Sequence, residues 1–161
     1  MTPMSDASNT IPAALLARIF AQARAEFPSE CCGYLRGRGE ATLLVPCKNF
    51  QDRLHALDPA TYPRTAANGY NFGGREQIEF ARGFEAADPP TIIYHSHPRV
   101  GAYFSAEDET AALSAGWSVD YLVVDVQEHG VREAVLFRRD PSAAPGAPAF
   151  VAVARFPGEV P

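Results

Sequence analysis

The sequence predicts a single α/β domain in which helices pack on a central mixed sheet. Helical and strand-like segments alternate in the order helix, hairpin, helix, strand, helix, hairpin, strand, which is typical of this class. A chain of 161 residues is also long enough to bury one core without covalent staples. Its composition, 47% hydrophobic and 20% charged, is ordinary for a globular protein. We therefore expect one domain over residues 11–156, after a polar, disordered leader at residues 1–10.

The first helix is expected to begin near Thr10 or Ile11 and to end at Phe27-Pro28, because proline stops a helix beyond its first turn. Its apolar stripe at helical spacing comprises Leu15, Leu16, Ile19, Phe20 and Ala23. The hairpin that follows consists of strands at residues 30–36 and 41–45 around a turn at residues 37–39.

Residues 46–74 show little periodicity, although residues 53–57 alternate like an edge strand. A segment this long without clear structure is usually functional or mobile in a compact domain. Residues 75–85 then predict a second helix, with Ile78 and Phe84 among its buried positions.

The second half of the chain is more regular. A short apolar run predicts a buried strand that ends in two histidines, and Ser105 begins a third helix. The remaining elements are strands at residues 119–126, 131–137 and 150–156, the last of them at an edge and after a Pro/Ala linker.

Composition excludes several classes of function. A net charge of −5 and a pI of about 5.3 disfavour a nucleic-acid partner. No apolar run approaches the roughly 20 residues that span a bilayer, so no membrane association is expected. The first ten residues lack the basic and apolar regions of a signal peptide, and the cysteine count is odd at three. We expect a cytoplasmic protein with reduced thiols.

His95 and His97 are the clearest candidates for chemistry. Side chains alternate faces along a strand, so these two histidines point the same way, and Pro98 ends the ladder because it has no N–H to donate. With Asp108 a short loop later they form a three-ligand set that leaves one position open, as in catalytic zinc sites. The sequence thus predicts one Zn²⁺ per chain.

Ser105 and Asp108 have a second interpretation. A serine followed three residues later by an acid is a helix-capping pattern, and capping alone would explain both residues. The histidines favour a combined role, in which Asp108 ligates the metal and Ser105 also offers its hydroxyl to a developing oxyanion. Glu30 lies at the start of a strand, where local sequence alone favours an ordinary solvated glutamate.

Together, Glu30 and the pattern H-x-H-P-x6-S-x-x-D of residues 95–108 resemble the signature of the JAMM (MPN+) metalloproteases. The resemblance extends to residues 32–35 and to the apolar strand before His95. It implies a deaminase-like α/β/α sandwich in which His95, His97 and Asp108 bind zinc. It also implies that Glu30 is the general base and acid, and that Ser105 stabilises the tetrahedral intermediate.

Family members hydrolyse peptide or isopeptide bonds at the C-terminal tails of ubiquitin-like proteins, and small prokaryotic-type members act on sulfur carriers. The short chain resembles that compact, standalone group, so a sulfur-carrier substrate would come from another chain. Weak candidates for substrate contact are Tyr103, Phe104 and His55, and the loop aromatics Tyr70 and Phe72 could also line a groove. The oligomeric state stays open, a homodimer included.

Two other classes of protein share part of this pattern. A catalytically inactive scaffold or binding module would keep the fold, but such relatives usually lose ligands, and this chain keeps all five signature residues. A zinc deaminase would need H-x-E and P-C-x-x-C, and the chain has neither. Cys31 and Cys32 suggest a second metal or a thiol nucleophile, but small thiols on a strand are more often core residues.

Overall fold

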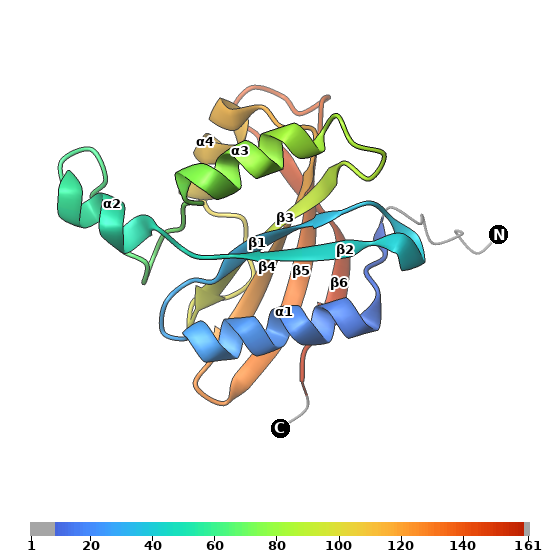
Figure 1. Ribbon diagram of the computed structural model, residues 1–161, viewed down its shortest axis with the longest axis horizontal. Helices are drawn as coiled ribbons and strands as arrows, with labels where there is room; N and C mark the ends of the chain where they lie inside the picture. Colours follow the sequence, from blue (N-terminus) through green and yellow to red (C-terminus); the bar gives the residue numbers. More distant parts are fainter. Residues whose placement is uncertain (1–8, 160–161) are drawn as a thin grey trace.

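The computed structural model describes residues 9–159, which form a three-layer α/β structure (Figure 1). The α-helices of this range are α1 (Ala13–Glu26), α2 (Gln51–Leu57), α3 (Gly74–Gly83) and α4 (Ala106–Ala115). The strands are β1 (Cys32–Arg36), β2 (Leu43–Cys47), β3 (Pro90–Pro98), β4 (Asp120–Gln127), β5 (Gly130–Arg139) and β6 (Phe150–Pro157). Most of the predicted leader, residues 1–8, lies outside the described residues.

The strands form one mixed sheet in the order β2-β1-β3-β4-β5-β6. Only the central β3–β4 pair is parallel, and α4 supplies its crossover connection. The other neighbouring pairs are antiparallel, including the predicted hairpin of β1 and β2. The predicted mixed sheet and the edge position of the last strand are therefore confirmed.

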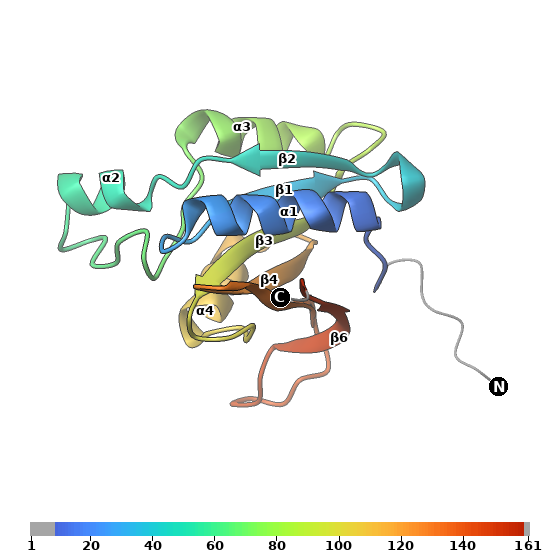
Figure 2. The same cartoon turned by 90° about the horizontal axis from the view of Figure 1, so that it is seen from below.

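Helices cover both faces of the sheet. Figures 1 and 2 show α1 on one face, with α3 and α4 on the other. Alternating side chains of β4 serve the two cores: Leu122 and Val124 pack on the α1 side, while Tyr121 and Val123 pack on the opposite side. The predicted α/β/α arrangement is therefore confirmed.

Helix α1 is attached to the sheet through its predicted stripe and one polar side chain. Gln22 donates to the carbonyl of Cys32 at 2.9 Å and accepts from the hydroxyl of Tyr94 at 2.5 Å. The ring of Tyr94 crosses β1 at Gly33, where an added Cβ would lie 2.3 Å from the tyrosine oxygen. A glycine is required there because the aromatic ring occupies the space of a side chain.

The strand predicted at residues 53–57 is wrong, because this segment belongs to helix α2. Five residues are too few to separate the two periods, and arginine, leucine and alanine all favour helix. Asn49 supports the helical start, because its side-chain oxygen accepts from the N–H of Gln51 at 2.9 Å. Figure 1 shows α2 projecting beyond the end of the sheet.

The expected burial of Ile78 is also wrong, since its side chain is 55% exposed. Phe80 is the buried anchor of α3, and Phe84, which is half-buried, follows it by four residues on the same face. Ile78 lies two residues before Phe80 and is therefore turned away from the core. No helix within residues 9–159 has the length and apolar character needed to cross a membrane.

Candidate metal and catalytic site

Strand β3 positions the two histidines. All nine of its residues are buried, and their side chains alternate between the two cores. Ser96 faces the α1 side, where its hydroxyl accepts from the N–H of Cys31 at 2.7 Å. His95 and His97 face α4, with their Nε2 atoms 3.0 Å apart. The predicted shared face of the two histidines is confirmed.

The start of α4 brings the carboxylate of Asp108 to the histidines. Ser105 is the N-cap residue and accepts from the N–H of Asp108 at 3.0 Å, while Asp108 Oδ2 accepts from the N–H of Ser105 at 3.0 Å. The same Oδ2 lies 3.2 Å from the Nε2 atoms of both His95 and His97. The capping box is therefore real, and it holds the carboxylate against the imidazoles.

The three donor atoms have the spacing that a tetrahedral metal requires. Their separations are 3.0, 3.2 and 3.2 Å. Metal–ligand bonds of about 2.0 Å at tetrahedral angles place neighbouring ligand atoms about 3.3 Å apart. The donor atoms of His95, His97 and Asp108 thus fit a small divalent cation.

The Nδ1 atoms of His95 and His97 have different surroundings. His97 Nδ1 lies 3.0 Å from the carbonyl oxygen of Gly101, which assigns the proton to Nδ1 and leaves the Nε2 lone pair for a metal. His95 Nδ1 is the one fully buried side-chain polar atom of residues 9–159 that has no hydrogen-bond partner. Instead, the ring of His95 stacks on Tyr70, with 4.5 Å between ring centroids and an interplanar angle of 20°.

Glu30 is buried beside the histidines, with a side-chain exposure of 5%. One carboxylate oxygen and one nitrogen from each of His95 and His97 lie within 4.8 Å of one another, so this group could also hold a metal. The backbone of Glu30 is fixed on both sides by residues 46–74. Its N–H donates to the carbonyl of Ala66 at 2.7 Å, and its carbonyl accepts from Asn49 Nδ2 at 2.9 Å.

Burial and neighbouring charge act on these groups in opposite directions. Burial raises the pKa of Glu30, and the nearby imidazoles of His95 and His97 only partly offset that rise. Burial would also raise the pKa of Asp108, but the same imidazoles outweigh it and hold that pKa well below its ordinary value. Burial disfavours the charged form of His97, but Asp108 raises its pKa overall. With both carboxylates ionised the cluster favours a positive charge at its centre.

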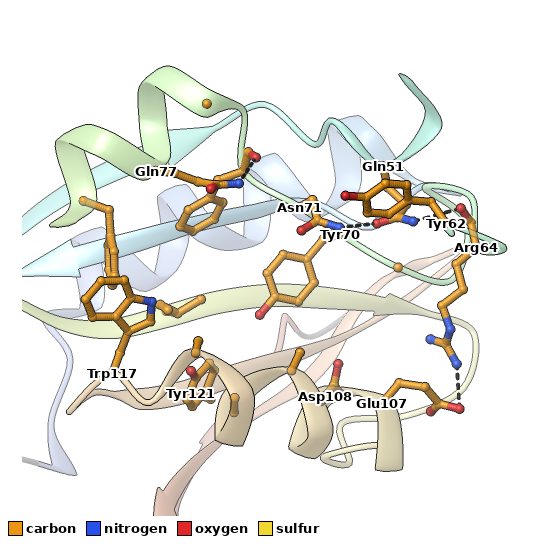
Figure 3. Close-up of a pocket in the computed structure, with 18 of the residues that line it drawn as sticks. Gln51, Tyr62, Arg64, Tyr70, Asn71, Gln77, Glu107, Asp108, Trp117 and Tyr121 are labelled. Atoms are coloured by element: carbon orange, nitrogen blue, oxygen red, sulfur yellow. Dashed lines mark hydrogen bonds and ion pairs between the residues drawn. The ribbon is translucent and has the colours of Figure 1, made fainter. Parts of the chain in front are cut away.

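A cavity of about 900 Å³ meets this site at Tyr70 and Asp108. Figure 3 shows it running between the segment of residues 51–74 with α3 above and α4 below. The indole of Trp117 lines one end of the cavity. The ion pair between Arg64 and Glu107 lies at the opposite end. A volume of about 900 Å³ is in the range of pockets that bind ligands.

The three weak candidates for substrate contact lie in different surroundings. Tyr103 lies beside the site, because its ring packs edge-on against His97 at 5.1 Å and is 51% exposed. Phe104 is half-buried and packs against the core beside Phe150, and it does not line the cavity. His55 contacts the carbonyl of Tyr62 through Nδ1 at 2.8 Å and does not line the cavity.

The three cysteines are free and buried, and all lie in the described part of the chain. Burial raises the pKa of Cys31 and of Cys47 to about 12, and raises that of Cys32 further. A thiolate is therefore strongly disfavoured at these positions. The interpretation of Cys31 and Cys32 as core residues is supported, since each belongs to one of the two cores.

The fold and the site define the class as an α/β protein with a buried His-His-Asp donor set and an adjacent glutamate. A family model described as prokaryotic homologs of the JAB domain matches residues 12–138. The chain belongs to this family, as its JAMM/MPN resemblance predicts.

Curated relatives agree with this membership, and a solved structure agrees with the fold. The chain is 30% identical over 119 residues to proteins named CysO-cysteine peptidase from Mycobacterium bovis and Mycobacterium tuberculosis, covering 73% of each chain. It also resembles the solution structure of protein DSY2949 from Desulfitobacterium hafniense, with a TM-score of 0.57 and 21% identity, covering 88% of this chain and 86% of that one. The structural likeness concerns the fold alone.

Proposed function

We propose that this protein is a zinc-dependent peptidase that cleaves at the C-terminal tail of a sulfur-carrier or other ubiquitin-like protein. The observation that carries the proposal is the triangle of donor atoms from His95, His97 and Asp108, with sides of 3.0 to 3.2 Å, beside the buried carboxylate of Glu30. Three protein ligands with one open position are the pattern of catalytic zinc, whereas structural zinc sites are closed by four.

His95, His97 and Asp108 would hold the ion. Bound there, zinc would act as a Lewis acid on the scissile carbonyl and would lower the pKa of a water molecule toward about 7. The chain's own contribution is to keep the donors preorganised. Strand β3 fixes both imidazoles, the Gly101 carbonyl sets the tautomer of His97, and the capping box aims Asp108.

Glu30 is the proposed general base and acid. It takes a proton from the attacking water and later returns it to the leaving amine. Burial raises the pKa of its carboxyl, which brings its basicity closer to that needed near neutral pH. Backbone hydrogen bonds to Ala66 and Asn49 hold the residue at this position.

Ser105 is the proposed oxyanion donor. Its oxygen accepts from the N–H of Asp108, and the hydroxyl hydrogen is still available to donate. A donor aimed at the developing oxyanion typically contributes about 10²–10³ in rate. A single hydroxyl can thus cap α4 and face the reacting carbonyl.

The substrate class is supported by the relatives and by the cavity. The relatives named CysO-cysteine peptidase suggest a small carrier protein with a C-terminal addition. The cavity beside the donor set has a volume of about 900 Å³, which is in the range of ligand-binding pockets and suits an extended tail. Both a peptide and an isopeptide bond are consistent with this arrangement.

The decisive experiment is incubation of the zinc-loaded protein with sulfur carriers that carry C-terminal extensions, read by intact mass. Loss of the extension, together with one zinc per chain by elemental analysis, is the expected result. Zinc-bound protein that leaves every carrier intact would favour the scaffold. If the protein is metal-free and does not take up zinc, the proposed zinc-dependent hydrolysis is wrong.

A further inference from the structure

The end of the cavity beside the donor set carries one positive charge. Arg64 is the only basic residue among those of the described chain that line the cavity. We propose that its guanidinium binds the free α-carboxylate at the C-terminus of the segment that the peptidase releases. This inference rests on the proposed function and specifies its substrate.

Arg64 is held in place by its own segment. Its carbonyl accepts from Gln51 Nε2 at 2.9 Å, and one guanidinium nitrogen donates to the carbonyl of Asn68 at 2.7 Å. The other terminal nitrogen lies 2.7 Å from Glu107 Oε1, across the cavity at the first turn of α4 (Figure 3). The side chain is thereby extended toward the donor set with its charge already facing a carboxylate.

A substrate carboxylate can take the place of Glu107 in the ion pair with Arg64. The side chains of Arg64 and Glu107 are 36% and 55% exposed. Ion pairs this exposed contribute little to stability, because water screens them. A substrate carboxylate offers the same chemistry as Glu107, and a planar guanidinium can bind it through two parallel hydrogen bonds. Exchange of one carboxylate for the other therefore costs little.

The position of Arg64 favours a free C-terminus close to the donor set. Its partner Glu107 directly precedes Asp108, the proposed metal ligand, in the first turn of α4. Each added residue in an extended tail would carry the carboxylate a further 3.3 to 3.6 Å, roughly, away from the guanidinium. A lysine linked through its side chain inside a protein offers no free α-carboxylate there.

The test compares two forms of one carrier that differ only at the last atoms: a single added residue with a free carboxylate, and the same residue as its amide. We expect the wild-type protein to prefer the free acid by about tenfold to a hundredfold in kcat/KM, the range for a hydrogen bond to a charged group. Arg64→Gln should reduce that ratio to near one, mainly through KM, while Arg64→Lys should retain part of it.

Arg53→Gln is the matched control, because Arg53 is exposed on the neighbouring α2 and does not line the cavity. It should keep the wild-type ratio. If Arg64 only supports its loop, both substrates would slow equally in Arg64→Gln and the ratio would survive, which overturns the inference. Equal rates for acid and amide in the wild type would also overturn it while leaving the peptidase intact. Failure to cleave either form would overturn the proposed function itself.

Discussion

Tyr70 lies flat against His95, with their ring centroids 4.5 Å apart. Because His95 Nδ1 has no hydrogen-bond partner within residues 9–159, packing takes over the orienting role that a carbonyl or carboxylate usually has for a metal-binding histidine. Tyr70→Ala should therefore weaken zinc binding by about tenfold or more, measured by competition with a chromophoric chelator. Tyr70→Phe keeps the ring and should bind zinc as the wild type does; equal loss in both variants would argue against stacking.

Glu30→Gln separates metal binding from catalysis. The amide keeps the size of the side chain but cannot accept a proton, so we expect turnover to fall by about 10²–10⁴ while zinc content is unchanged. Glu26→Gln makes the same change in a partly buried glutamate at the end of α1 and should leave turnover unaltered. Full activity in Glu30→Gln would remove Glu30 from the role of base.

Asp108→Ala tests whether this residue ligates or only caps. Both Asp108 and Glu107 are acids in the first turn of α4, where either one interacts favourably with the helix dipole. Zinc occupancy at limiting metal should drop in Asp108→Ala and stay near one in Glu107→Ala, as measured by elemental analysis after dialysis. Equal occupancy in the two variants would reduce Asp108 to a capping residue.

The choice of substitution at Ser105 can separate its role as helix cap from its proposed role as oxyanion donor. Glycine is an acceptable N-cap residue and should cost only a few tenths of a kcal/mol, roughly, whereas alanine should cost about 1 kcal/mol. Both changes remove the hydroxyl, so both should lower kcat by about 10²–10³. Thermal melts and single-turnover rates together check this. A Ser105→Gly protein with normal kcat would show that the hydroxyl serves the cap alone.

Ile78 is an exposed, large apolar residue of α3 that lines the cavity. If the carrier tail occupies this cavity, Ile78→Asp should raise KM severalfold, because burying an unpaired carboxylate against the tail is unfavourable. Stability should barely change, since the side chain is 55% exposed. Leu113→Asp is the control: Leu113 is 41% exposed on α4 and lies outside the cavity lining. Equal KM values for the two variants would place the tail elsewhere.

Much of the site could be predicted because it depends on local periodicity. The alternation of β3 places His95 and His97 on one face, and the capping pattern begins α4 where Asp108 can reach them. Glu30 is different, because its burial depends on Ala66 and on Asn49, which are distant in the chain. No local pattern reports such contacts, so Glu30 could be predicted only through the family resemblance.

The side chains and elements that local patterns leave open or place wrongly depend on distant parts of the chain. Tyr70 and Phe104 are both aromatic residues in loops, yet one stacks on His95 and the other packs against the core beside Phe150. In α2 the short run of residues 53–57 fits either period, and its outcome depends on Asn49. In α3, Phe80 rather than Ile78 is buried because the face of the helix that carries Phe80 packs against the sheet. Tertiary contacts decide these cases.

The pairing of β1 with β3 sets Cys32 opposite His95 and so brings Glu30 to the histidines from a position 65 residues earlier in the chain. The proposed acid and the proposed ligands therefore meet only after the centre of the sheet has closed. A nascent or partly unfolded chain can contain the proposed ligands of residues 95–108 and still lack the proposed base. Under the proposed function, hydrolysis then requires the completed sheet, and recovery of turnover during refolding would report when the β1–β3 pair closes.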